Sequence, residues 1–325
     1  MNIDESFWKY KRVFVTGGTG FIGSHLVKKL QSANAVVKQL VHERIPSDRG
    51  SIGIKDDLTS PSSSLKMFLE SFKPEIVFHL AAQPIVNLAL DDHLSTLKVN
   101  IDGTYNLLSA CYHLRWLSNF VHISTDKVYG NTPAIAHDTV PMSVTHPYNT
   151  SKLTGDLLAQ MYAHTFETPI TVIRNGNVYG PGDTHWDRIV PRTIARVLHG
   201  QPPILRGRGN PLRDYIYVDD IVIGYMNAAQ YGFGISTKPH ILNLGSYQAY
   251  SVLEISDKIL EICNRIDLTP QLEPLSRGEI PSQHIVDATA QDLIDWRPQV
   301  SLEDGLRRTV KWYTEYFKEN KYEAE

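Results

Sequence analysis

A glycine-rich turn between a short strand and a helix constrains this chain more than any other feature. The turn, Gly17-Gly-Thr-Gly-Phe-Ile-Gly23, follows the β-branched run at residues 12–16 and precedes a helical pattern over residues 24–30. Glycines at this spacing let the backbone turn tightly, approach a pyrophosphate and pack the helix on the strand, with the helix N-terminus facing the phosphates. The pattern therefore predicts a dinucleotide site contacted by Gly17, Thr19, Gly20, Phe21, Ile22 and Gly23.

The second predicted strand, residues 36–41, leads to the expected ribose end of that site. It is followed by His42-Glu43-Arg44, where an acidic residue that grips the ribose hydroxyls is expected. Glu43 can accept from those hydroxyls, whereas Arg44 can meet a 2′-phosphate, so NAD and NADP both stay open. Residues 46–64 have loop composition, and Asp57 and Leu58 are candidate adenine contacts.

Strands and helices then alternate along the chain. Residues 74–84 form a predicted strand, and residues 94–114 have the apolar spacing of an amphipathic helix. Asn100 interrupts that apolar face, either bonding a neighbouring backbone group or standing as a half-buried polar residue. The alternation predicts a doubly wound α/β fold with a parallel sheet. The candidate cofactor contacts from this part of the chain are Leu80, the small Ala81 and Ala82, Gln83 and Asn100.

The active-site prediction centres on residues 119–152. A strand at residues 119–123 delivers Ser124-Thr-Asp-Lys127, and a loop then presents Tyr148-Asn-Thr-Ser-Lys152. Residues four apart on a helix share one face about 6 Å apart, so the Lys152 ammonium is expected to favour the Tyr148 phenolate at neutral pH. Tyr148 is thereby predicted to act as a base, with Ser124 beside the cofactor.

The C-terminal half has a looser order of elements. A strand at residues 170–174 is followed by a loop at 175–182, beyond a strand's carboxyl end, where open α/β sheets bind ligands. We expect a nucleotide-binding domain at residues 1–180 and a smaller α/β substrate lobe at residues 181–325, with segments that interleave across this boundary.

Composition excludes several classes of protein. The net charge is −3 without a long basic run, which argues against nucleic-acid or anionic-membrane binding. The only cysteines, Cys111 and Cys263, make no disulfide framework and lack metal-ligand spacing. No stretch of about 18 apolar residues is present and the N-terminus lacks an apolar signal region. We therefore expect a cytoplasmic protein without a metal site.

Four motifs together resemble a known family. Val15–Gly23, Phe78-His-Leu-Ala-Ala82, the Tyr148/Lys152 pair and Arg213–Asp219 look like the extended short-chain dehydrogenase/reductase family of nucleotide-sugar epimerases and dehydratases. Within it, four segments, at residues 81–84, 124–127, 176–183 and 186–191, most resemble the CDP-glucose 4,6-dehydratases. The resemblance implies a Rossmann domain that holds NAD, a C-terminal lobe that holds a nucleotide sugar, and a homodimer built through helices like 94–114 and 150–164.

The resemblance also assigns roles to residues. Tyr148 would remove the proton of the sugar 4-hydroxyl, Thr125 would hydrogen-bond that hydroxyl, and Asn177, Arg188 and Arg213 would contact the substrate. Dehydration needs an acid and a base beyond those of a 4-epimerase, which Asp126 and Lys127 would supply. Two alternatives remain open: a 4-epimerase or reductase in which Asp126 and Lys127 are structural, and a non-catalytic dinucleotide-sensing protein.

Overall fold

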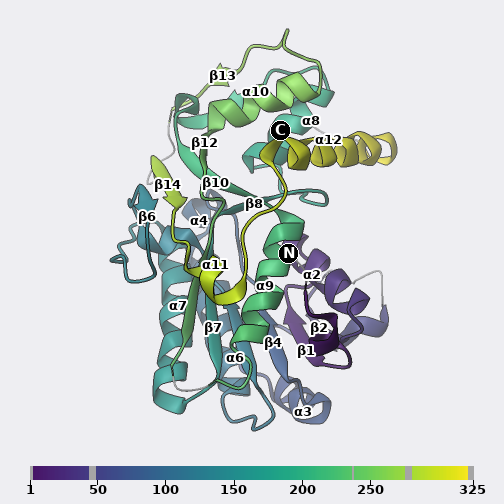
Figure 1. The fold of residues 1–325 in the computed structure, drawn as a ribbon, viewed down its shortest axis with the longest axis vertical. Coiled ribbons are helices and arrows are strands. Elements are labelled where there is room, and N and C mark those ends of the chain that lie inside the picture. Colours follow the sequence, from purple (N-terminus) through teal and green to yellow (C-terminus); the bar gives the residue numbers. More distant parts are fainter. Residues whose placement is uncertain (1–2, 44–48, 236–237, 275–279, 321–325) are drawn as a thin grey trace.

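A seven-stranded parallel sheet forms the larger part of the molecule (Figure 1). The computed structural model describes residues 3–43, 49–235, 238–274 and 280–320. Every strand pair in this sheet is parallel, in the order β11-β7-β5-β4-β1-β2-β3, which is a Rossmann-like arrangement. Its strands are β1 (Arg12–Thr16), β2 (Val36–Val41), β3 (Ile52–Lys55), β4 (Ile76–His79), β5 (Asn119–Ile123), β7 (Ile170–Asn175) and β11 (His240–Leu244).

Helices cover both faces of this sheet because its strands are apolar on both sides. Val13 and Val15 of β1 pack into one core with α2 (Phe21–Ser32), α9 (Val218–Tyr231) and α11 (Thr289–Ile294). Phe14 faces the opposite core, which contains α3 (Ser63–Phe72), α6 (Gly103–Cys111) and α7 (Pro147–Phe166). Burial on both faces is typical of a parallel sheet in a doubly wound fold, so the predicted fold class is confirmed.

The second lobe lies above the carboxyl ends of these strands in Figure 1. Its helices, α8 (Ile189–Leu198), α10 (Val252–Ile262) and α12 (Leu302–Glu319), share an apolar core with the buried Tyr215 and Tyr217 of β10. Its small sheet has the order β12-β10-β14-β6, and β8 also pairs with β10. These strands are β6 (Ala134–Ile135), β8 (Asn177–Tyr179), β10 (Leu212–Tyr217), β12 (Ala249–Ser251) and β14 (Ser282–Ile285).

The shorter elements complete the described chain. They are α1 (Glu5–Trp8), α4 (Leu88–Asp91), α5 (His93–Leu97), the π-helical turn η2 (Lys98–Asp102), the 3₁₀ turns η1 (Arg49–Ser51), η3 (Asp126–Tyr129) and η4 (Arg206–Gly209), and the paired strands β9 (Ile204–Leu205) and β13 (Gln271–Leu272). No helix in the described ranges is long and apolar enough to cross a membrane.

Three local predictions need correction or refinement. The loop expected at residues 46–64 contains the edge strand β3, whose short Ile-Gly-Ile-Lys run has a weak apolar signal. The helix expected at 94–114 is divided into α5, η2 and α6, and its Tyr105 and Tyr112 are exposed while Asn100 is buried. The interior face therefore agrees with the apolar spacing at Leu108, which is fully buried, but not at Tyr105 and Tyr112. β11 is a strand of the large sheet and α9 packs against that sheet, although both follow residue 180. The division into domains at that position therefore remains a proposal.

Candidate active site

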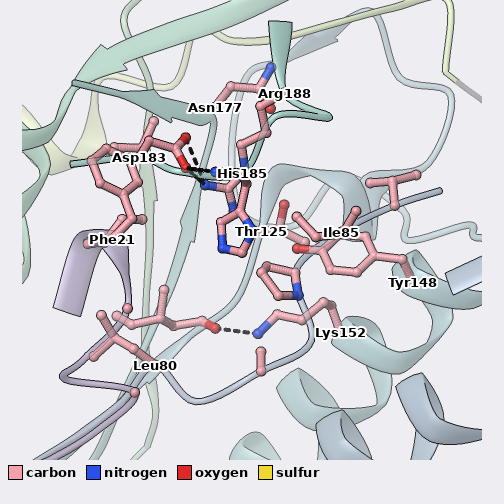
Figure 2. A pocket seen from close by; sticks show the side chains of 18 of the residues that line it. Phe21, Leu80, Ile85, Thr125, Tyr148, Lys152, Asn177, Asp183, His185 and Arg188 are labelled. Atoms are coloured by element: carbon pink, nitrogen blue, oxygen red, sulfur yellow. Dashed lines mark hydrogen bonds and ion pairs between the residues drawn. The ribbon is translucent and has the colours of Figure 1, made fainter. Parts of the chain in front are cut away.

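One cavity of about 940 Å³ lies where the carboxyl ends of the large sheet meet the second lobe. Its wall includes the glycine turn, the Tyr148/Lys152 pair and, from the second lobe, Arg213. Figure 2 shows Tyr148, Lys152 and Thr125 gathered on one side of this cavity and Phe21 and Leu80 on the other. The structure thus brings the predicted dinucleotide site and the predicted active site into one space.

The glycine turn at this wall fits a pyrophosphate. Gly17 has a φ of 71°, and a Cβ there would lie 2.6 Å from the Ala81 amide nitrogen, so no larger residue fits without displacing the backbone. Gly20 begins α2 without a side-chain cap, and the first-turn amide groups of a helix point out of its N-terminus. The Ser124 hydroxyl, another wall group, is buried with no hydrogen-bond partner among the described residues. These donors suit the phosphates and the polar edge of a dinucleotide.

The ribose and adenine end differs in part from the prediction. Asp57 and Leu58 line the cavity as expected, together with His42. A hydrogen bond from the Thr59 backbone is the largest cause that lowers the pKa of Asp57. Glu43 is exposed and is not part of the wall, and Arg44 lies outside the described residues. The choice between NAD and NADP therefore does not follow from these two residues.

Gln83 and Asn100 lie behind the wall instead of in it. The Gln83 backbone N–H donates to Asn100 Oδ1 at 2.7 Å, and Asn100 Nδ2 donates to Ser151 Oγ at 2.8 Å. Leu80, Ala81 and Ala82 do line the cavity. Asn100 thus ties the loop after β4 to α7, the helix that carries Tyr148 and Lys152.

Tyr148 and Lys152 lie on the first turns of α7, both nearly buried. Burial raises the pKa of Tyr148 to about 12, while Arg188 and the Thr125 hydroxyl oppose the shift. Burial also lowers the pKa of Lys152 to about 8, and its Nζ donates to the Ile123 carbonyl at 2.6 Å. Desolvation of the phenolate therefore works against the stabilisation by Lys152 that the four-residue spacing predicts, and this role of Lys152 stays a prediction.

The segment after β5 divides between the cavity and the interior. Thr125 and Lys127 line the cavity, whereas Asp126 is fully buried and does not. Asp126 Oδ1 accepts from Thr125 Oγ1 at 3.0 Å and from Lys127 Nζ at 3.2 Å, and its Oδ2 has no partner among the described residues. Lys127 Nζ also donates to Asn177 Oδ1 at 3.1 Å. Within the described part of the chain, the hydrogen bonds from Thr125 and Lys127 thus connect the Asp126 carboxylate to the cavity.

A buried arginine, Arg174, connects two elements that carry residues of the cavity wall. Arg174 donates from Nε and Nη2 to both carboxylate oxygens of Asp156 on α7, at 2.8 and 2.9 Å, and from Nη1 to the Tyr129 hydroxyl at 2.8 Å. Tyr129 belongs to η3, and its hydroxyl in turn donates to Asn243 Oδ1. This bidentate pair links α7, which carries Tyr148, to η3, which carries Lys127.

The predicted substrate contacts all lie in the cavity wall. Arg188 Nη1 lies 3.0 Å from both carboxylate oxygens of the buried Asp183. Asn177 is engaged with Lys127, and the Arg213 guanidinium donates to the carbonyls of Leu212, Ile280 and Pro281. Arg213 is therefore oriented by backbone groups at its place in the wall.

Several wall residues were not anticipated from the sequence. His185, which Figure 2 shows projecting into the cavity near Thr125, follows Asp183, whose Oδ1 accepts from the His185 backbone N–H. Asp187 accepts from Asn87 of the large domain and from Arg206 of η4, so it bridges the two sides. Gly180-Pro-Gly182 is a turn signal that marks the loop bearing His185, whereas no local pattern indicates Arg206. Within the described ranges, no three His, Cys, Asp or Glu side chains are placed to hold a metal ion.

Comparisons with known proteins agree with this geometry. The model of the NAD dependent epimerase/dehydratase family matches residues 13–245. The chain is 31% identical to the CDP-glucose 4,6-dehydratase of Salmonella typhimurium, covering 96% of this chain and 92% of that protein. It is 30% identical to the UDP-glucose 4-epimerase of Mycolicibacterium smegmatis, covering 93% and 98%. The structure of the UDP-glucuronic acid 4-epimerase of Bacillus cereus, in complex with UDP-glucuronic acid and NAD, superposes with a TM-score of 0.85 at 28% identity, covering 94% and 99%.

Proposed function

This chain belongs to the NAD-dependent epimerase/dehydratase family, and we propose that within it the chain is a nucleotide-sugar 4,6-dehydratase. One observation carries the proposal: the Lys127 ammonium lies in the cavity wall together with Thr125 and Tyr148. A 4-epimerase needs only the tyrosine base and a hydroxyl partner, because hydride leaves and returns at the same carbon. Dehydration needs further acid and base groups, and Lys127 with its partner Asp126 supplies them.

The proposed reaction converts an NDP-hexose to the NDP-4-keto-6-deoxyhexose. The glycine turn would hold NAD, which when bound would supply the redox chemistry by which hydride leaves C4 and returns at C6. Tyr148 removes the proton of the 4-hydroxyl, to which Thr125 hydrogen-bonds, and the C4 ketone acidifies the proton on C5. Lys127 takes the C5 proton and Asp126 protonates the departing 6-hydroxyl, so that one water molecule leaves. When C6 is reduced, Lys127 returns its proton to C5, which gives the 4-keto-6-deoxy sugar. Lys152 positions the site through its bond to the Ile123 carbonyl.

The burial of Asp126 determines how its proton would reach the substrate. Among the described residues, Thr125 and Lys127 donate hydrogen bonds to the Asp126 carboxylate, and both line the cavity. Transfer of a proton from Lys127 to Asp126, across their 3.2 Å hydrogen bond, would produce the required base and acid together. The Asp126 proton then passes to the 6-hydroxyl through Thr125 or Lys127. Placement of these groups next to the sugar is the contribution of the protein.

A 4-epimerase is the second candidate, and one observation favours it. Asp126 is fully buried and absent from the cavity wall, as a purely structural carboxylate would be. The 30% identity to a UDP-glucose 4-epimerase points the same way. Under this alternative, Lys127 and Asp126 form a structural ion pair and Tyr148 with Thr125 carries the reaction.

We propose CDP-glucose as the substrate and NAD as the cofactor, on the likeness to the Salmonella typhimurium enzyme and to NAD-bound relatives. Arg188, Arg213 and Asn177 would hold the substrate, and guanidinium groups suit its diphosphate.

A homodimer through α5, α6 and α7 is also proposed, because Leu94, Tyr105, Leu157 and Met161 are exposed there. We also propose a cytoplasmic location, because the two free thiols, Cys111 buried and Cys263 half-buried, suit a reducing compartment.

A panel of CDP-, UDP-, dTDP- and GDP-hexoses tests the function. Purified protein is incubated with each nucleotide sugar, the products are separated by chromatography, and their masses are determined by mass spectrometry. A dehydratase yields a product lighter by one water, whereas an epimerase yields a product of unchanged mass with inverted C4. Turnover without loss of water from any sugar would reject the dehydratase and support the epimerase.

A further inference from the structure

A fully buried glutamine of the second lobe holds the turn that carries Lys127. Gln283 of β14 donates from Nε2 to the carbonyls of Asp126, at 3.0 Å, and Gly130, at 2.9 Å. Both partners are acceptors, so the amide NH₂ and not its oxygen must face the turn. A single amide group therefore joins the first residue of η3 to the residue that follows its end.

This turn has a conformation that needs support. Gly130 has a φ of 60°, and any Cβ there would collide with the Ser143 carbonyl. The turn itself is closed by a weak set of bonds, with the Gly130 N–H donating to the Lys127 carbonyl at 3.2 Å and the Lys127 N–H to Thr125 Oγ1 at 3.4 Å. The two bonds from Gln283 set the spacing of its ends, and this spacing determines where Lys127 Nζ lies between Asp126 and Asn177.

Gln283 also lies beside the expected substrate contact Arg213. The two residues are register partners in the parallel pair of β14 and β10. On its other edge β14 pairs with β6, where Ile285 lies opposite Ile135. Because backbone pairing holds β14 on both edges, loss of the Gln283 amide removes the two bonds to the turn while the strand keeps its place.

We propose that Gln283 is a positioning residue that couples the second, substrate-binding lobe to the proton-transfer turn at residues 126–130. The inference rests on the proposed dehydratase reaction. Gln283 does not line the cavity and acts through Lys127. It serves the elimination step, for which Lys127 must be aligned with the C5 proton, and not the C4 oxidation performed at Tyr148.

Gln283→Met, which removes both donors and keeps the side-chain length, tests this role in the holoenzyme. Elimination should slow by about 10- to 100-fold, the scale of a small misplacement of a catalytic group, while C4 oxidation and the KM for the sugar nucleotide change little. Bound NADH should therefore accumulate on addition of substrate. Hydrogen exchange of peptides covering residues 124–131 should increase in the same variant without substrate. Gln283→Glu, whose protonated carboxyl keeps one donor, should show smaller changes in both measurements and covers the case in which the methionine variant does not fold.

Two controls separate positioning from general destabilisation. Asn119→Leu removes a buried amide at the opposite end of β5, which donates to Thr171 and to the Ala229 carbonyl, and should lower stability without NADH accumulation. In the double variant Gln283→Met/Lys127→Met, elimination should be no slower than in Lys127→Met alone, because both changes act on one group. Equal slowing of oxidation and elimination, additive effects in the double variant, or unchanged exchange at 124–131 would each overturn the proposal. If the wild type releases no water from any sugar, the proposed function fails, whereas the exchange measurement still decides whether Gln283 holds the turn.

Discussion

Replacement of Lys127 by methionine separates the dehydratase from the epimerase. Lys127 Nζ donates to Asp126 and Asn177 and lines the cavity beside Tyr148. If Lys127 removes the C5 proton, the variant should still oxidise C4 but should not eliminate water. Loss of a general base slows a reaction by about 10²- to 10⁴-fold, which corresponds to about 2.7 to 5.4 kcal/mol in the barrier to elimination.

The structural disturbance should be smaller than this kinetic effect. Methionine leaves Asp126 Oδ1 with Thr125 as its remaining donor, and the Lys127 side chain is 17% exposed. Because solvent can partly replace the lost ammonium, the free energy of unfolding should fall by about 1 to 3 kcal/mol, the penalty of an under-satisfied buried acceptor. Thermal unfolding of the variant measures this fall separately from the rate.

The assay follows the absorbance of enzyme-bound NADH after substrate is mixed with the enzyme. Lys127→Met should accumulate NADH, whereas Tyr148→Phe should give no NADH because the oxidation step loses its base. Lys66→Met, at an exposed position on α3, serves as the control and should turn over normally. Normal release of water by Lys127→Met would refute the acid-base role of this lysine.

Three further predictions concern the cofactor, the phosphates and a buried carboxylate. Denaturation of the purified protein should release mainly NAD, identified by chromatography, and recovery of mainly NADP would instead implicate Arg44. Arg213→Ala should weaken binding of the nucleoside diphosphate by about 1.5 to 3 kcal/mol, the effect of losing a charged hydrogen bond, and should leave NAD retention unaltered. Calorimetric titration measures this change, and an unchanged dissociation constant would show that Arg213 does not contact the substrate. Burial raises the pKa of Asp214 from its usual 3.8 to about 6, so the folded protein binds this proton more tightly than the unfolded chain does. The free energy of unfolding should therefore fall by about 3 kcal/mol as the pH rises from about 4 to about 6. Denaturant unfolding of the wild type and Asp214→Asn across this range measures the difference, and parallel pH profiles would contradict the assignment.

The sequence alone was sufficient for the features that depend on local spacing. The glycine turn at 17–23 and the strands at 12–16, 36–41 and 119–123 are recognisable because their residue types determine the backbone conformation over a few positions. The four-residue interval between Tyr148 and Lys152 likewise places both on the same helix, and α7 confirms it. The parallel sheet follows from the regular alternation of such strands with helices.

Tertiary structure decided what each of these groups contacts. The spacing of Tyr148 and Lys152 cannot show that burial raises the pKa of the phenol, because desolvation depends on residues packed around it from other elements. Nor can the run Ser124–Lys127 show that Asp126 points into the core while Lys127 points into the cavity. The bond from Gln283 to Asp126 spans 157 positions, and the short strand β14 that delivers it has no distinctive local pattern. Contacts of this kind form only when the whole chain is packed, since the energy that selects them comes from long-range burial and pairing and leaves no periodicity in the sequence.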